Sequence, residues 1–500
     1  MSNRQSLRGA YLLVGAKGLS AVLGLLSTLV LARLLTPEDY GLVVLVDAAV
    51  TVLASLTELQ LAAVLIHLPH LTDAHLRTAW TMNCLRAALL ATLVVLMGPV
   101  LASVYAKPEL QGIAWGISLS LFMGGLINPK MTLLVRELNF KSEFILSLSQ
   151  KLTGLIVTVV AALVLKNYWA LVLGTIATQA CALVVSYRCV PFRPAFTLVH
   201  MRSLWGYSVW LTGSLFVKTL TSKLDQFVVG KLFSVQTTGL YSVATRLSNV
   251  LFTDTLAAAL RVISPSLVAH QHQPAELNQA YLRSLGVVCM LFLPIAVMAS
   301  ALSTPLIRLA LGTQWMGVAP AFQWLVAALC IEAIGSVALS VVLATLNTKL
   351  AFQRDVLSLL ARCTCMAVGV FTAGFEGLLW GRFASALLDA LLYFRMAAQV
   401  TALSLWTQLL HHWPCGLVSV WVFGVLYLLQ GQHNWVQVSP FHTALWLVAY
   451  GGLGLLLLVG GLALLWWLRG QPQSTEWLIA RYVGQTIKHR LLKNSLNAAP

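Results

Sequence analysis

Long apolar segments separated by short polar turns run along most of the chain, and their residues do not alternate between polar and apolar with a period of two. A helix needs about 20 apolar residues to cross a hydrocarbon core roughly 30 Å thick, whereas the strands of a membrane barrel are about ten residues long and alternate strictly. These segments therefore have the length and pattern of helices. We expect an all-α, polytopic membrane protein with about 14 transmembrane helices.

The polar turns set the approximate limits of the spans. The expected spans are 11–35, 41–66, 78–104, 110–135, 145–165, 168–187, 205–230, 239–265, 283–311, 318–346, 352–374, 377–398, 405–429 and 443–468. The first span follows Arg4 and Arg8 and has no small-residue cleavage site behind it. We therefore interpret it as a membrane helix rather than a removed signal peptide.

Composition agrees with this interpretation. The chain is 59% hydrophobic and 10% charged, with a mean hydropathy of +0.83, whereas soluble domains carry about 25% charged residues. A net charge of +16 is compatible with nucleic-acid binding, but no long soluble region exists to carry such a surface, so we expect no nucleic-acid partner. The eight cysteines lie within or at the ends of apolar spans, which indicates small core residues rather than disulfides or metal ligands.

The basic residues of the loops are distributed unequally between the two sides. About fifteen lie on the side that faces both termini, whereas the opposite loops offer only Lys107, Lys166 and Lys231. By the positive-inside rule, both termini are expected on the cytoplasmic side of a bacterial inner membrane.

Two segments of the chain resemble each other. Arg33–Leu42 and Lys231–Leu240 share a base, a leucine, a hydroxyl residue and a final Gly-Leu at a constant offset of 198 residues, 231 minus 33. A repeated unit predicts two pseudo-symmetric six-helix lobes, 1–200 and 201–400, around a central cavity. Two additional helices fill 401–469, and the basic tail 470–500 is suited to the membrane surface. Chance similarity of membrane turns is the alternative.

Several charges lie deep within the expected spans, where each costs about 2.5 to 3.5 kcal/mol on insertion scales. The candidate cavity residues are Lys17, Arg86, Lys218, Lys223, Asp225, Arg246, Asp254 and Arg261. Cations outnumber carboxylates in the spans that hold most of these residues, so an anion such as phosphate or pyrophosphate is the natural ligand. The alternative is that such charges form ion pairs between helices. For Arg382 with Asp389 and for Arg362 with Asp355, we regard an ion pair and a place in the cavity as equally good interpretations.

The second span carries two carboxylates, Asp47 and Glu58. Burial raises the pKa of a carboxylate, so these two residues are candidates for carrying a coupling proton. The sequence offers no catalytic constellation, metal-ligand spacing or Gly-rich phosphate loop. We therefore expect a transporter without a cofactor rather than an enzyme.

The two junctions carry a family resemblance. Leu31–Gly41 (LARLLTPEDYG), Leu224–Lys231 (LDQFVVGK) and Thr238–Ala244 (TGLYSVA) resemble the junctions of Wzx-type flippases of lipid-linked oligosaccharides. These flippases belong to the multidrug, oligosaccharidyl-lipid and polysaccharide exporter superfamily. The likeness covers about residues 1–400.

The resemblance implies two lobes that alternate between inward-open and outward-open forms. It implies an undecaprenyl-diphosphate type of substrate carrying an O-antigen, capsule or exopolysaccharide repeat unit, which moves from the cytoplasmic to the periplasmic leaflet. The cavity cations would then receive the diphosphate, and the two additional helices would shape a groove for the lipid tail. A polysaccharide polymerase and glycosyltransferases would be functional partners.

Three other functions remain open at this point. A multidrug exporter of the same superfamily would favour an acidic, aromatic cavity, which disagrees with the excess of cations. A membrane glycan polymerase or ligase would need a sizeable external loop, and the longest expected loop, about 430–442, is short. A scaffold without transport activity would have no use for buried net charge.

Overall fold

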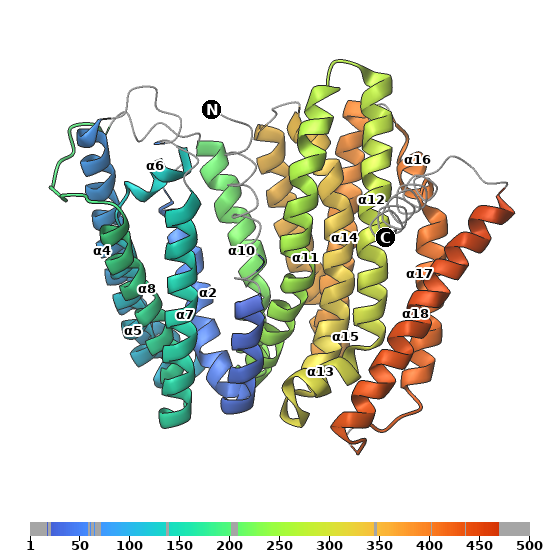
Figure 1. The fold of residues 1–500 in the computed structure, drawn as a ribbon, viewed down its shortest axis with the longest axis horizontal. Helices are drawn as coiled ribbons and strands as arrows, with labels where there is room; N and C mark the ends of the chain where they lie inside the picture. The colour runs from blue at the N-terminus through green and yellow to red at the C-terminus, as the bar shows by residue number, and fades with distance from the viewer. Residues whose placement is uncertain are drawn as a thin grey trace, which may run out of the picture. The chain divides into compact units, whose positions relative to one another are not determined.

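The structure is a computed structural model that describes residues 18, 22–58, 61, 65, 72–136, 140–201, 209–344, 348–401, 403–435 and 437–469, and within these ranges it contains helices and no strand (Figure 1). The helices are α2 (Pro37–Leu56), α4 (Asp73–Tyr105), α5 (Glu109–Gly125), α6 (Met131–Arg136), α7 (Phe140–Leu165), α8 (Trp169–Cys189), α10 (Val209–Leu232), α11 (Val235–Ala269), α12 (Pro274–Ala301), α13 (Ser303–Leu311), α14 (Val318–Ala344), α15 (Thr348–Thr401), α16 (Leu405–Leu410), α17 (Trp413–Gln430) and α18 (Pro440–Leu468), with a short 3₁₀ turn at Thr313–Trp315. A shorter apolar helix covers Val22–Leu34. The predicted all-α membrane class is confirmed.

Within the described residues, ten helices are long and apolar enough to cross a membrane, whereas the sequence suggested about 14 spans. Helix α15 contains two of the expected spans, and α5 is only 17 residues long. Helix α10 carries charges along its length, and the described part of the first expected span is the short helix Val22–Leu34. A helix is present in every expected range, so the difference arises from length, charge and the joining of two spans.

Prolines mark the starts of several helices. Pro37, Pro274, Pro414 and Pro440 lie in the first turn of α2, α12, α17 and α18. The fixed backbone angle of proline suits this position, and its missing N–H removes no helical hydrogen bond there.

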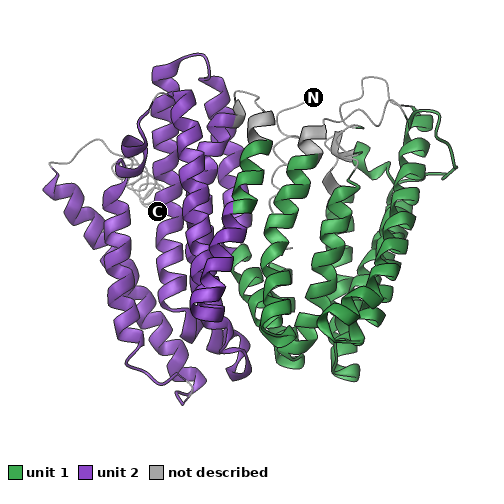
Figure 2. Ribbon diagram, turned by 180° about the vertical axis from the view of Figure 1, so that it is seen from behind, with its two compact units in different colours: residues 1–250, 348–360 green, residues 251–347, 361–500 purple. Residues whose placement is uncertain are grey.

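The chain forms two compact units (Figure 2). Unit 1 comprises residues 1–250 and 348–360, and unit 2 comprises residues 251–347 and 361–500, so the division falls inside α11 and α15. These units are defined by contacts, whereas the lobes 1–200 and 201–400 were predicted from the sequence repeat. The two divisions are different quantities, so the lobes stay a prediction.

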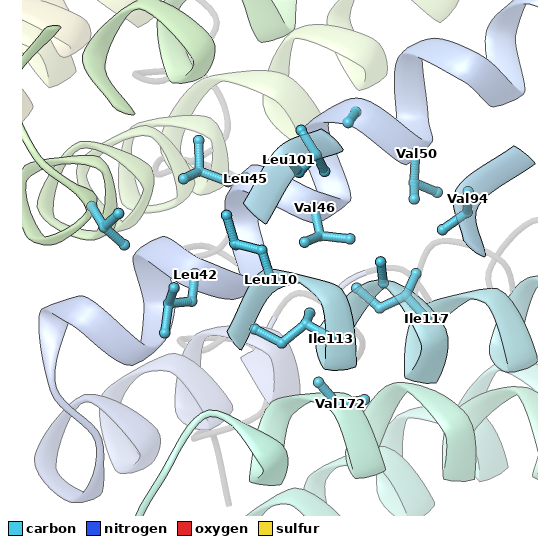
Figure 3. Close-up of a cluster of buried hydrophobic side chains, with 13 residues drawn as sticks. Leu42, Leu45, Val46, Val50, Val94, Leu101, Leu110, Ile113, Ile117 and Val172 are labelled. Carbon is cyan, nitrogen blue, oxygen red and sulfur yellow. The ribbon is translucent and has the colours of Figure 1, made fainter. Parts of the chain in front are cut away.

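In unit 1, α4 packs against α5, α7 against α8, α5 against α8 and α2 against α10. The core between α2, α4, α5 and α8 consists of aliphatic side chains such as Leu45, Val46, Leu110, Ile113 and Val172, each with 0% of its surface exposed (Figure 3). This packing fixes α2, which carries Asp47 on its exposed side.

In unit 2, α12 packs against α14 and α17, and α17 packs against α18. Helix α15 turns back on itself at Ala373 and Gly374, where Gly374 has a φ of +59°, a value that favours glycine. A Cβ atom on Gly369 would collide with the carbonyl oxygen of Gly377, and a Cβ atom on Gly377 would collide with that of Gly369. Glycine therefore allows the two halves of α15 to lie backbone to backbone as a hairpin.

Candidate functional site

The two repeated junctions begin their helices in the same way. The Thr36 hydroxyl accepts a hydrogen bond from the backbone N–H of Asp39 at 3.3 Å, and the Asp39 carboxylate accepts one from the N–H of Thr36 at 3.0 Å. At the second junction, the Ser234 hydroxyl accepts a hydrogen bond from the N–H of Thr237 at 3.0 Å. These hydroxyls satisfy backbone donors that a helix start leaves unpaired. The two caps lie at equivalent positions of the sequence repeat.

The two junctions also contact each other through equivalent residues. A Cβ atom on Gly41 would collide with the carbonyl oxygen of Val235, and a Cβ atom on Gly239 would collide with the carbonyl oxygen of Pro37. Gly41 corresponds to Gly239 in the repeat, and Pro37 corresponds to Val235. Reciprocal contacts of this kind are expected where two copies of one surface meet around a twofold axis. This backbone packing of α2 against the start of α11 is called the junction seal below.

The junction seal continues along α10 and the end of α4. A Cβ atom on Gly230 would lie 2.6 Å from the Leu45 side chain and 3.1 Å from the Tyr105 ring. The Lys231 ammonium donates to the carbonyl oxygen of Val104 at 2.7 Å. The structure therefore brings the first turns of α2 and the last turns of α4 and α10 together at one end of unit 1.

A lysine of the loop after α4 adds an ion pair at this end. The Lys107 ammonium lies 2.6 Å from the Glu38 carboxylate, and both side chains are partly exposed. This hydrogen bond raises the pKa of Lys107 above its usual value. The pair joins α2 to the α4–α5 corner within the first repeat.

Two of the predicted cavity cations bind the two carboxylates of α2 and its C-terminal turn. Lys223 on α10 lies 3.1 Å from Asp47, and Arg86 on α4 lies 2.7 Å from Glu58. The Arg86 guanidinium also donates to the carbonyl oxygen of Ala54 at 3.0 Å and to the Thr57 hydroxyl at 3.2 Å. Sequence reasoning selected these four charged residues but did not predict that they form two interhelical pairs.

Lys218 binds a carboxylate outside the predicted site. Its ammonium lies 3.6 Å from Asp355, whose side chain is 2% exposed, and Arg354 lies 2.8 Å from the same carboxylate. The Ser214 hydroxyl donates to Asp355 as well. Asp355 therefore joins α10 to α15 through two cations and a hydroxyl group.

The remaining predicted residues have different surroundings. Asp225 is buried and accepts a hydrogen bond from the Tyr241 hydroxyl at 2.7 Å. Arg246 and Arg261 are exposed, and no carboxylate of the described residues lies within ion-pair distance of either one. Lys17 and the side chain of Asp254 lie outside the described residues.

Glu332 of α14 is a charged residue within a membrane span that sequence reasoning missed. Its carboxylate lies 2.8 Å from the Arg362 guanidinium and 2.8 Å from the Arg382 guanidinium, whose side chains are 7% and 5% exposed. A lone acidic residue within an apolar span was the signal that could have identified it. The three side chains tie both halves of the α15 hairpin to α14.

Unit 2 contains an apolar cavity of about 330 Å³. It lies between α12, α14, the second half of α15 and α17, and its lining includes Val297, Trp324, Ala327, Phe383 and Phe423. Ser419 also lines it, with a buried hydroxyl that has no hydrogen-bond partner in the described structure. Such a lining suits a hydrocarbon chain.

Comparisons with known proteins identify relatives of this chain. The model of a family described as polysaccharide biosynthesis protein matches residues 30–320. The succinoglycan biosynthesis transport protein ExoT of Rhizobium meliloti (strain 1021) is 25% identical over 299 residues, which are 59% of this chain and 59% of that protein. The lipopolysaccharide biosynthesis protein WzxC of Escherichia coli (strain K12) is 23% identical over 427 residues, which are 82% of this chain and 85% of that protein.

Solved structures share the fold. The lipid II flippase MurJ, in an inward closed conformation, matches with a TM-score of 0.69 and 15% identity, covering 90% of this chain and 98% of that one. An inward-facing multidrug resistance MATE family transporter of the MOP superfamily matches with a TM-score of 0.58 and 13% identity, covering 77% of this chain and 95% of that one. At these identities the likeness concerns the fold.

Proposed function

The chain belongs to the polysaccharide biosynthesis protein family, and we propose from this premise that it is a flippase for a polyprenyl-diphosphate-linked oligosaccharide. The substrate moves from the cytoplasmic to the periplasmic leaflet by alternating access of two lobes. The names of the relatives support a transport role, since ExoT is a biosynthesis transport protein and MurJ a lipid flippase.

The observation that carries the proposal is an exposed arginine within a membrane span that lies outside the ion pairs of the described residues. Asp47 binds Lys223 and Glu58 binds Arg86, so each of these two carboxylates is already paired with one cation. Arg246 on α11 adds an exposed cation beyond these pairs. A diphosphate matches such a surface because arginine binds its oxygens in bidentate fashion and lysine acts as a point charge.

The direct test is the leaflet distribution of a labelled lipid-linked oligosaccharide in cells depleted of the protein. We expect the labelled sugar to accumulate on the cytoplasmic face, because its charged and hydrophilic headgroup does not cross the bilayer unaided. Normal appearance of the sugar on the periplasmic face would contradict the proposal.

Arg246→Gln should reduce translocation about tenfold or more without lowering the amount of protein in the membrane, because a hydrogen bond to a charged group contributes about 1.5 to 3 kcal/mol. Translocation of the labelled substrate measures the effect. Arg193→Gln is the matched control, since it removes the same charge from an exposed arginine outside the helices. Equal activity of the two variants would remove Arg246 from the site.

The apolar cavity of unit 2 offers a place for part of the polyprenyl chain. It is bordered by α17, one of the two additional helices. Ala327→Trp should lower translocation several-fold by filling this cavity, because overpacking excludes any other occupant. Ala463→Trp is the control, since Ala463 is exposed on α18. If both variants transport equally well, the cavity does not hold the lipid.

Topology and partners complete the proposal. The bias of loop lysines and arginines supports cytoplasmic termini in the bacterial inner membrane, which places the junction seal at the periplasmic end. The lobes are residues 1–200 and 201–400, with additional helices in 401–469 and a surface-bound tail in 470–500. A polymerase and glycosyltransferases would use and supply the lipid-linked sugar.

Coupling to a proton remains part of the proposal. Asp47 and Glu58 are its candidate carriers, and each of them binds a cation. A proton on either carboxylate therefore competes directly with Lys223 or Arg86. Unchanged transport by an Asp47→Asn, Glu58→Gln double variant under an imposed proton gradient would exclude this mechanism.

A further inference from the structure

The Asp47–Lys223 ion pair joins the two sequence repeats next to the junction seal. Along α2, Gly41 meets Val235, Leu45 meets Gly230 and Asp47 meets Lys223. The partners of α2 thus run backward along the chain from the start of α11 into α10. The ion pair is the contact of this series that lies farthest from the helix ends.

Accessibility changes along the same series. Leu45 is 0% exposed and Val235 is 6% exposed, whereas the side chains of Lys223 and Asp47 are 20% and 56% exposed. The ion pair is therefore more exposed than the apolar contacts of this series. A ligand that reaches Lys223 does not have to enter the seal first.

Lys223 has one ammonium group, which can bind either the Asp47 carboxylate or a diphosphate ligand. Asp47 offers a single negative charge, whereas a diphosphate ester offers more negative charge and more acceptor oxygens. We propose that the Asp47–Lys223 ion pair is a latch on the junction seal, and that a bound diphosphate opens it by taking Lys223 from Asp47. This inference rests on the proposed function and adds to it the step that links binding to movement.

Removing the latch should favour separation of α2 from α10 by a measurable factor. A partly exposed ion pair changes an equilibrium about two- to fivefold. The seal itself still holds the helices together, so the change is a shift in population rather than a loss of structure.

The experiment measures the opening of the seal as the labelling rate of a cysteine at position 235. The full-length Val235→Cys protein is purified in detergent and treated with a maleimide, and labelling is read at individual cysteines by peptide mass spectrometry. Inorganic pyrophosphate is the probe for the headgroup, and chloride at the same ionic strength controls for screening of the ion pair. The native Cys84, 7% exposed in the same unit, reports general loosening of the fold.

Asp47→Asn should raise labelling at position 235 about two- to fivefold without pyrophosphate, because it removes the charge that holds Lys223. Pyrophosphate should raise labelling of the Val235→Cys parent by a similar factor, and it should have no further effect in Lys223→Gln. Glu38→Gln is the matched control, since it also removes a carboxylate of α2 from an ion pair, but from a pair within the first repeat. Its labelling should equal that of the parent.

Three results would overturn the latch. They are unchanged labelling in Asp47→Asn, an equal rise at Cys84, and a pyrophosphate effect no larger than that of chloride. The labelling assay needs no lipid-linked sugar, so its outcome is separate from the leaflet assay. Pyrophosphate could raise labelling at position 235 while depletion of the protein leaves the leaflet distribution of the labelled sugar unchanged. That pair of results would reject the flippase proposal and support the latch.

Discussion

Gly239→Ala should abolish translocation and lower the stability of the folded protein, because its methyl group has no space at the junction seal. The added Cβ would meet the carbonyl oxygen of Pro37, a backbone atom that cannot rotate away as a side chain does. Overpacking of this kind costs about 1 to 3 kcal/mol, and here it acts directly on the contact between the repeats. Gly41→Ala should have the same effect through Val235.

The double variant gives the sharper result. One methyl group already separates the two backbones, so the second should add little, and the combined loss of stability should be clearly less than additive. Thermal unfolding in detergent measures stability, and labelling at position 235 measures the opening of the seal. Gly452→Ala is the control, because a Cβ atom added to Gly452 would have no other atom within 4 Å. Additive losses, or equal losses in the control, would contradict a shared contact.

Glu332→Gln should be among the most destabilising single substitutions that keep the size of the side chain. It removes the negative charge that two buried guanidinium groups share, and breaking a buried ion pair costs about 3 to 5 kcal/mol. We expect a markedly lower unfolding temperature and less protein in the membrane. Glu38→Gln breaks an exposed pair and should change stability by about 1 kcal/mol or less.

A second substitution separates charge from size. Adding Arg382→Gln to Glu332→Gln removes one of the two cations and should recover part of the lost stability, because the two sites interact. A double variant that is as unstable as the sum of the two single variants would show that packing, and not charge, holds α14 to the α15 hairpin.

The fold could be predicted from the sequence because membrane helices depend on local properties. Segment length and hydropathy located a helix in every expected range. The structure adds that both segments of the sequence repeat contain a helix start, at Thr36 and Ser234. Lys218 and Asp225 are seven residues apart, so they lie on one face of α10. Spacing cannot name the partner on another helix, since Lys218 binds Asp355 and Asp225 accepts from Tyr241.

The balance of charge shows the same limit. Counting charges along the chain suggested a surplus of cations in the spans that hold Lys218 and Lys223, whereas each of these two lysines binds a carboxylate from another helix, as Arg86 does. The partners of these cations are Asp355, Asp47 and Glu58. The smallest separation along the chain is 28 residues, between Arg86 and Glu58. Only helix packing brings such residues together, so the surplus charge is smaller and more localised than the composition indicates.

The hairpin of α15 has a consequence for how the protein is made. Ala373 and Gly374 leave no loop between its halves, so the helix that carries Arg362 is joined directly to the helix that carries Arg382. Glu332 precedes both arginines in the chain and is synthesised first. Both ion pairs of Glu332 can therefore form only after the whole α15 hairpin has been synthesised, which makes the attachment of α14 to this hairpin a late step in folding.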